Sequence, residues 1–206
     1  MKKVIALLGV MLFSASAFAL NAAAPAGKDC AAQKAEFEKY VAGQNNISFI
    51  AQNILINLAD PMENQTDEEA LDQAACYDTF EVRGQSLASF VHRNANIFPG
   101  DIYGREAAKM NQFADRIQRL GAQAKLNKVA AQGNTSHTVE FILINFADPM
   151  AKLSDSQAAP LAKAYKGCNV NGQPMTEFVR VHASEFMGNV SQELDAFVER
   201  VNKLTK

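Results

Sequence analysis

Apolar residues recur at helical spacing through most of the chain. Between positions 47 and 58 they follow three-and-four steps on one face, at Ile47, Ile50, Ala51, Ile54, Leu55 and Leu58. Phe49 and Ile56 lie off that face, which predicts a helix covered on most sides, starting near Ala31 and running to Leu58. Residues 139–147 are apolar nearly all round, so we expect a buried central helix there. Because no segment alternates convincingly between apolar and polar residues, the pattern predicts an all-α fold.

One nine-residue run occurs twice. Residues 54–62 read ILINLADPM and residues 142–150 read ILINFADPM, an offset of 88 residues. Without a gap at that offset, residues 50–118 and 138–206 share 21 identities in 69 pairs. Such register predicts a tandem duplication of a roughly four-helix unit. We expect the two units to pack as a pseudo-two-fold helical bundle.

The duplicated units carry matching boundary signals. Pro61 and Pro149 are expected to end the helices that precede them, because a residue before proline is pushed out of the helical region. The next helices are predicted to begin with capping boxes. One is Thr66 with Glu69, and the other is Ser154 with Gln157. Residues 121–133 are expected to form an extended helix or a linker that joins the units.

The N-terminus has the pattern of a cleaved secretory signal. Two lysines precede an apolar run, and the segment ends in Ala17-Phe18-Ala19. The chain is therefore expected to divide into a signal peptide (1–19), a flexible mature N-terminus (20–30), helical repeat 1 with the connecting helix (31–130) and helical repeat 2 (131–206). This pattern predicts a periplasmic protein, with secretion from the cell as the alternative.

Charge and hydropathy exclude some classes of binding partner. The full sequence has 20 Lys and Arg against 22 Asp and Glu, and cleavage would remove Lys2 and Lys3, leaving 18 against 22. No basic stripe is interleaved with aromatic residues, so we expect no nucleic-acid partner. No second apolar run reaches the length of a membrane span, so we expect no stable membrane insertion after signal cleavage.

Three cysteines remain after the predicted cleavage, at Cys30, Cys76 and Cys168. In an oxidising compartment two of them can form a disulfide, which leaves one thiol over. The sequence does not choose among the three pairings. We expect the odd thiol to be buried and inert rather than reactive or joined to another chain.

Five polar or aromatic residues are candidate ligand-binding positions. Asn57 and Asn145 lie inside the most apolar helix of each unit, where each is either a ligand contact or a buried amide that fixes helix register. We expect the buried amide. His182 is expected on the apolar face of its helix, as a satisfied core histidine or as a ligand-binding side chain. Tyr77 and Tyr165 occupy equivalent positions in the units and are candidates where the units meet.

The sequence offers no catalytic or metal-binding motif. The first unit has an acidic group comprising Asp60, Glu63, Asp67, Glu68, Glu69 and Asp72, but its spacing is not that of an EF-hand and it has no turn glycine. No histidine has another three or four residues away, and HExxH, CxxCH, a P-loop and GxSxG are all missing. We therefore predict no catalytic residue, no metal and no cofactor.

Together these patterns favour a non-catalytic binding or protein-interaction role in the cell envelope. A groove between the units would hold an envelope protein, a peptide or an apolar small ligand. Two alternatives stay open. One is an enzyme whose site lies between the repeats and uses His182, Tyr77, Tyr165 or a cysteine. The other is a secreted effector that acts on a host.

Overall fold

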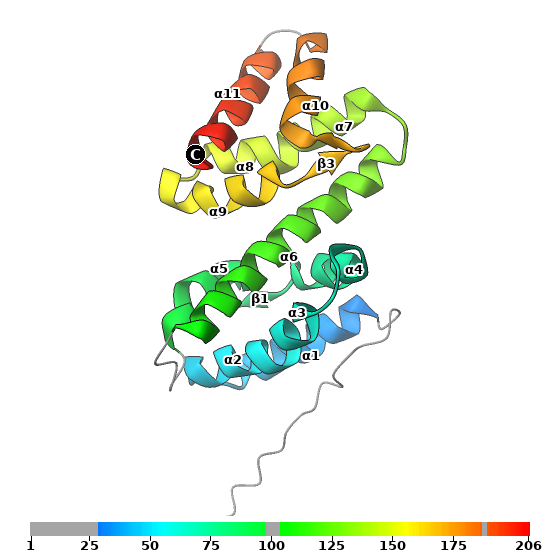
Figure 1. Ribbon diagram of the computed structural model, residues 1–206. Helices are drawn as coiled ribbons and strands as arrows, with labels where there is room; N and C mark the ends of the chain where they lie inside the picture. Colours follow the sequence, from blue (N-terminus) through cyan, green and yellow to red (C-terminus); the bar gives the residue numbers. More distant parts are fainter. Residues whose placement is uncertain (1–28, 98–103, 187–188) are drawn as a thin grey trace, which may run out of the picture.

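Helices make up nearly all the regular structure in this protein. The computed structural model describes residues 29–97, 104–186 and 189–206, and the expected all-α fold is confirmed at this level (Figure 1). Short strands pair as two-residue antiparallel hairpins, β1 with β2 and β3 with β4. The predicted signal peptide (1–19) lies outside the described residues, as do positions 20–28 of the predicted flexible segment.

The first lobe extends from α1 to the first part of α6. Its elements are α1 (Cys30–Ala42), α2 (Ile47–Ile54), the π-helical η1 (Leu55–Ala59), α3 (Asp60–Glu63), α4 (Asp67–Tyr77), β1 (Glu81–Val82), β2 (Gln85–Ser86), α5 (Leu87–Asn94), the 3-10 helix η2 (Ala95–Ile97) and the long α6 (Arg105–Ala130).

The second lobe extends from the last part of α6 to the C-terminus. Its elements are α7 (Thr135–Ile142), the π-helical η3 (Leu143–Ala147), α8 (Asp148–Ala151), α9 (Asp155–Lys166), β3 (Asn169–Val170), β4 (Gln173–Pro174), α10 (Met175–His182), the 3-10 helix η4 (Ala183–Glu185) and α11 (Asn189–Leu204). Each element from α2 to η2 therefore has a counterpart of the same type that starts 88 residues later, from α7 to η4.

Side-chain caps fix where several helices begin. Both predicted capping boxes are present: the Thr66 hydroxyl accepts from the Glu69 backbone while the Glu69 carboxylate accepts from the Thr66 N–H, and Ser154 and Gln157 do the same. These bonds satisfy N–H groups that have no partner inside the helix. The sequence predicts them well because they depend only on residues three apart.

The first predicted helix is broken into two. We expected one helix from about Ala31 to Leu58, whereas α1 ends at Ala42 and α2 begins at Ile47. Asn46 caps α2 by accepting a hydrogen bond from the Ser48 N–H at 2.9 Å. Asparagine favours a cap over a helix interior because its side chain competes for backbone hydrogen bonds. The expectation of an unbroken helix was therefore wrong.

The expected helix ends at Pro61 and Pro149 were also wrong. A proline in an α-helix clashes with the carbonyl four residues earlier and has no N–H to donate to it. Here a π-helical turn precedes each proline, and the Asp60 and Asp148 N–H groups reach back five residues, to the carbonyls of Leu55 and Leu143. This wider turn shifts the hydrogen-bond register, so the helical path continues through the proline.

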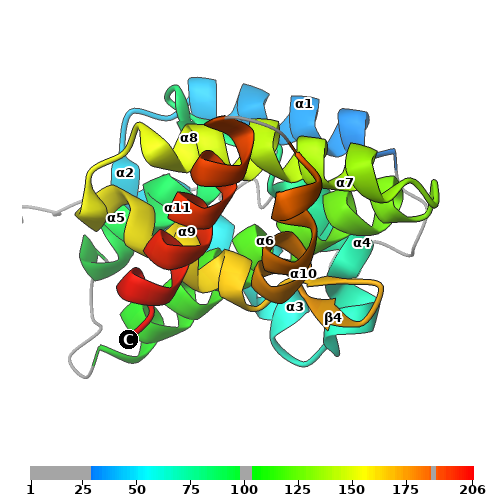
Figure 2. The same ribbon diagram turned by 90° about the horizontal axis from the view of Figure 1, so that it is seen from above.

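Helix α6 spans both lobes and contributes to both hydrophobic cores. Met110, Phe113, Ile117 and Leu120 of α6 pack in the first core, whereas Ala122, Leu126 and Ala130 pack in the second. Viewed from above, the second lobe lies over the first (Figure 2). The connecting segment predicted at 121–133 is thus helical to Ala130.

The last helix of each lobe follows a different offset from the other elements. Helices α6 and α11 begin at Arg105 and Asn189, which are 84 residues apart rather than 88. Their contacts agree with the new offset, because Arg116 donates to the Met62 carbonyl and Arg200 donates to the carbonyl of Met150, its counterpart. The ungapped alignment was therefore wrong beyond η2, since the connection before α11 is four residues shorter.

Candidate interaction surface

Two isoleucines at equivalent positions project to solvent. Ile56 on η1 is 53% exposed and Ile144 on η3 is 55% exposed. Phe49, two helical turns before Ile56 and also 55% exposed, continues the first stripe, and the partly buried Phe141 lies three residues before Ile144. We name these the α2–η1 face (Phe49 and Ile56) and the α7–η3 face (Phe141 and Ile144).

This exposure overturns the expectation that both helices are covered on most sides. Only one stripe of each helix enters a core, formed by Ile50, Ile54 and Leu58 in the first lobe. Helix α2 lies at the lower edge of that lobe in Figure 1, and the exposure of Phe49 and Ile56 shows that a second side of the α2–η1 segment meets solvent. The amphipathic pattern predicts the buried stripe but does not show whether a second apolar stripe is covered.

Asn57 and Asn145 lie beside the exposed isoleucines rather than in a core. Each amide nitrogen donates to the carbonyl four residues earlier, Asn57 to Asn53 at 3.1 Å and Asn145 to Phe141 at 2.9 Å. Asn57 is half-buried and Asn145 is exposed. Their hydrogen bonds are local to the π-helical segment, so the predicted role as core amides that fix helix register is not what the structure shows.

The two candidate tyrosines lie in separate cores. Tyr77 is 3% exposed, and its hydroxyl accepts a hydrogen bond from Gln73 Nε2 at 2.7 Å. Tyr165 is 7% exposed, and its ring lies 4.7 Å from that of Phe146. Burial raises the pKa of both hydroxyls, and the nearby Asp78 carboxylate adds to the rise at Tyr165. Both are therefore neutral, packed side chains at physiological pH.

The lobes meet in direct contact along one side of α6. A Cβ on Gly121 would lie 2.6 Å from Asp78 Cβ, and a Cβ on Gly167 would lie 2.6 Å from Arg119 Cδ. Across the junction, Lys125 on the last part of α6 pairs with Asp78 of the first lobe at 2.7 Å, and Lys163 of α9 pairs with Asp115 on the first part of α6 at 2.5 Å. At these contacts the lobes leave no room for a ligand between them.

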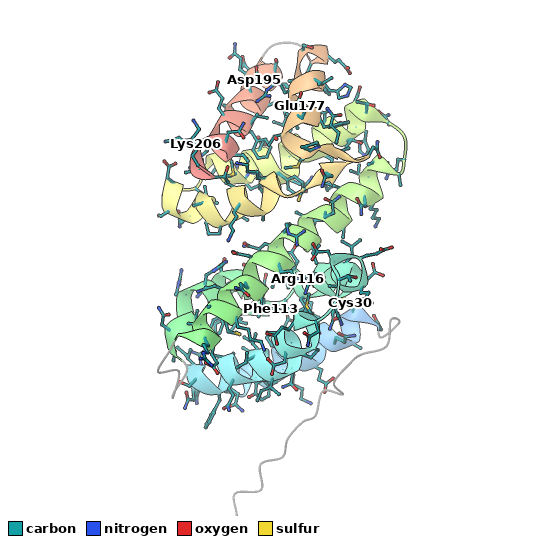
Figure 3. All side chains as sticks on the ribbon, in the orientation of Figure 1. Cys30, Phe113, Arg116, Glu177, Asp195 and Lys206 are labelled. Carbon is teal, nitrogen blue, oxygen red and sulfur yellow. A yellow bond between two sulfur atoms is a disulfide. The ribbon has the colours of Figure 1, made fainter. Side chains whose placement is uncertain are left out.

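Cys30 and Cys76 form a disulfide that ties the start of α1 to the end of α4. Figure 3 places Cys30 at the edge of the first lobe. Cys168 is the free cysteine, and it is fully buried. Burial raises the pKa of its thiol to about 12, although the nearby Arg119 opposes the rise. The expectation of a buried odd cysteine is therefore confirmed, and its high pKa makes the thiol a poor nucleophile at physiological pH.

His182 is half-buried on α10. Its Nδ1 lies 2.7 Å from the Glu185 carboxylate, and its ring centroid lies 4.7 Å from that of Phe178. Its partners are therefore local. Among the described residues, no hydrogen bond joins His182 to Tyr77 or to the disulfide. A different histidine, His92, lies near the junction, with its Nε2 3.3 Å from Asp115, which also pairs with Lys163 of α9 at 2.5 Å.

Within residues 29–97, 104–186 and 189–206, no three His, Cys, Asp or Glu side chains gather closely enough to hold a metal ion. In the same part of the chain, no helix combines the length and the hydropathy that crossing a membrane requires.

Each lobe has a hollow between its π-helical segment and its last helix. In the first lobe the hollow measures about 120 Å³ and is lined by Met62, Phe113 and Arg116. Figure 3 shows Phe113 and Arg116 on α6. In the second lobe the equivalent hollow measures about 380 Å³ and is lined by Met150, Phe197 and Arg200, among others.

Matching arginines form one wall of these hollows. Arg116 donates to the carbonyls of Met62 and Gln65 and pairs with Asp67, and Arg200 makes the equivalent contacts with Met150, Leu153 and Asp155. Burial alone would raise the pKa of Asp67, but hydrogen bonds and charge from Arg119 and Arg116 outweigh it and leave that pKa below its usual value.

Sequence reasoning missed the exposed isoleucines and the two hollows. One signal was present in the repeated run. The run keeps Ile56 and Asn57 in both copies, and both residues lie off the stripe that the core requires. Retention of residues that the core does not need points to a use at the surface.

No family model matches this sequence, and neither the curated proteins nor the solved structures contain a match to it.

Proposed function

We propose that this protein is a non-catalytic interaction protein of the cell envelope, which holds a partner protein through the α2–η1 and α7–η3 faces. The observation that carries this proposal is the matched exposure of Ile56 and Ile144, at 53% and 55%. A large aliphatic side chain exposed in both lobes leaves apolar area in water unless a partner covers it.

The shape of these faces favours a protein partner over an apolar small ligand. Small-molecule sites are concave and enclose most of their ligand, whereas Ile56 and Ile144 protrude from helices. Polar side chains flank the isoleucines, including Asn57, Asn145 and Asp60. An apolar centre with a polar rim is the usual arrangement at protein–protein interfaces.

We further infer that the lobes are tandem copies that pack with approximate two-fold symmetry about α6. The first part of α6 closes the first core as α11 closes the second, and the last part of α6 opens the second lobe as α1 opens the first. Helices α1 and α11 both run roughly against the direction of α6 (Figure 1). Two copies of one face on a single chain support a partner held at two points.

The periplasm is the proposed location. The disulfide between Cys30 and Cys76 is typical of oxidising compartments. The N-terminal pattern of basic, apolar and small residues supports export.

An enzyme with its site between the repeats has less support. The groups proposed for it, Tyr77, Tyr165 and Cys168, are buried and hold their protons at physiological pH. A general base or nucleophile works best with a pKa near the working pH.

Site-specific photocrosslinking in cells that produce the full chain tests this proposal. A photoreactive phenylalanine analogue is placed at position 56 or 144, and, as matched controls, at Glu68 or Ser156, which are exposed at equivalent positions on α4 and α9. The proposal predicts the same protein adduct from 56 and 144 and no such adduct from 68 and 156. Adducts only to a second copy of this chain, or equal adducts from the controls, would contradict it.

A further inference from the structure

The hollow of the first lobe shows how this fold binds an ammonium group. Lys109 of α6 lines the hollow, and its Nζ lies 2.8 Å from Asp60 and 2.5 Å from Glu63. Phe113 also lines this hollow, so apolar surface is available to the methylene chain of the lysine. Hydrogen bonds to Asp60 and then Glu63 raise the pKa of Lys109, which keeps its ammonium charged.

The second lobe keeps the apolar floor but replaces the lysine. At the offset of 84 residues that α6 and α11 follow, Glu193 takes the place of Lys109, and Phe197 takes the place of Phe113. Asp148 is the counterpart of Asp60 and lines the same hollow. No internal lysine reaches across it from α11, and the hollow is larger, at about 380 Å³ against about 120 Å³.

The acidic side chains of the second hollow are not engaged by a cation of the described chain. Across the residues that the structure describes, neither Asp148 nor Glu193 forms an ion pair, whereas Asp60 pairs with Lys109. Two basic residues also line the hollow. Arg200 is committed to backbone carbonyls and to Asp155, and Lys152 is exposed at the rim, where water solvates its charge.

We propose that the second-lobe hollow binds the side chain of a lysine from a partner protein, with its ammonium between Asp148 and Glu193 and its methylenes on Phe197. Asp148 has the same helical position as Asp60, one of the two carboxylates that bind the Lys109 ammonium in the first lobe. The other, Glu63, has Ala151 as its counterpart, so Glu193 would supply the second carboxylate from α11. This site is separate from the isoleucine faces and does not depend on them.

An NMR titration of the ¹⁵N-labelled full chain with Nα-acetyl-lysine-N-methylamide tests the proposal. A ligand of this size is expected to bind with a dissociation constant on the order of 1 mM. Saturable shifts are expected at the amides of α8 and α11, with no response to the analogue acetylated at Nζ. Absence of saturable shifts with the lysine amide would overturn the proposal.

Substitutions on α11 locate the site. Glu193→Lys restores the lysine of the first lobe and is expected to weaken binding at least tenfold, because its own ammonium fills the hollow. Asp195→Lys makes the same charge change on the same helix but outside the hollow, near the outer end of the lobe (Figure 3), and is expected to keep binding within about twofold at physiological salt. Equal losses for both variants would overturn the assignment.

Two further measurements separate a partner's lysine from other cations. Lys152→Gln removes the basic side chain of the rim that has no ion-pair partner among the described residues, and it is expected to strengthen binding, so a loss of binding would count against the proposal. Free 1,5-diaminopentane is expected to bind no more tightly than the lysine amide. Tenfold tighter binding of the diamine would instead identify a site for free polyamines and overturn the role of a partner's lysine.

Discussion

Asp78, at the end of α4, lies so close to Gly121 of α6 that a Cβ on Gly121 would be 2.6 Å from Asp78 Cβ. Asp78 also accepts an ion-pair hydrogen bond from Lys125 of α6 at 2.7 Å. The helix that joins the lobes is therefore seated against α4 where only glycine fits.

Gly121→Ala is expected to destabilise the protein. Alanine normally stabilises a helix interior by up to about 1 kcal/mol relative to glycine, but overpacking against Asp78 is expected to cost about 1–3 kcal/mol. Equilibrium unfolding in urea measures the difference. Gly43→Ala is the control, because its Cβ would lie no closer than 3.5 Å to a neighbour, and it is expected to be nearly neutral. A stabilised Gly121→Ala variant would contradict the close seating of α6.

The disulfide is expected to contribute strongly to the stability of the first lobe. It closes a loop with a sequence separation of 46 residues, and removing such a bridge typically costs about 2–5 kcal/mol. The double variant Cys30→Ser, Cys76→Ser is the change, and urea unfolding is the measurement. Thiol counting in denaturant should find one free thiol before reduction and three after it. Three thiols without reduction would show that the bridge is not formed.

Alkaline pH is expected to lower the free energy of unfolding because the Cys168 thiol ionises more readily in the unfolded chain. The thiol ionises near pH 9 in an exposed state but only near 12 in the folded protein, because it is buried. The folded chain therefore keeps a proton that the unfolded chain loses, so stability is full below pH 9 and falls between about pH 9 and 12.

A Cys168→Ala variant isolates this effect. Between pH 7 and pH 10 the unaltered protein should lose about 1 kcal/mol more stability than the variant does. The cavity that alanine leaves lowers the stability of the variant at every pH, so only the change with pH is compared. Parallel pH profiles would show that Cys168 is not the titrating group.

Local patterns predicted much of the helical framework. Thr66 with Glu69 and Ser154 with Gln157 mark helix starts because the bonds they form involve only neighbouring residues. The disulfide pairing could not be predicted from the sequence, because Cys30 meets Cys76 only when α1 packs against α4. The role of Pro61 was misjudged because the π-helical turn that accommodates it involves bonds across five residues, which apolar spacing does not reveal.

The candidate site was harder to predict than the fold. Ile56 and Ile144 look like core residues by composition, and only the packing of each lobe shows that they face solvent. Asn57 and Asn145 were identified in the correct segments but with the wrong environment, since their amides bond within their own helix. Lys109 and Glu193 occupy equivalent positions in the two lobes, and this equivalence could be recognised only from the 84-residue offset between α6 and α11 in the structure.

Substitution of the two isoleucines is expected to leave folding intact. Ile56→Asp and Ile144→Asp change exposed side chains, and such changes usually alter the free energy of unfolding by no more than about 0.5 kcal/mol. Urea unfolding of both variants checks that any loss of binding comes from the surface. A loss of several kcal/mol would mean that these residues support the fold.

The most direct test of the interaction surface is the dissociation constant of the partner that crosslinks at position 56, measured for the unaltered chain, each single Ile→Asp variant and the double variant. Burial of an isoleucine is worth about 1.5–3 kcal/mol, so each single change is expected to weaken binding about tenfold or more. Two linked contacts predict a still larger loss in the double variant. A double variant that binds with unchanged affinity would contradict the account.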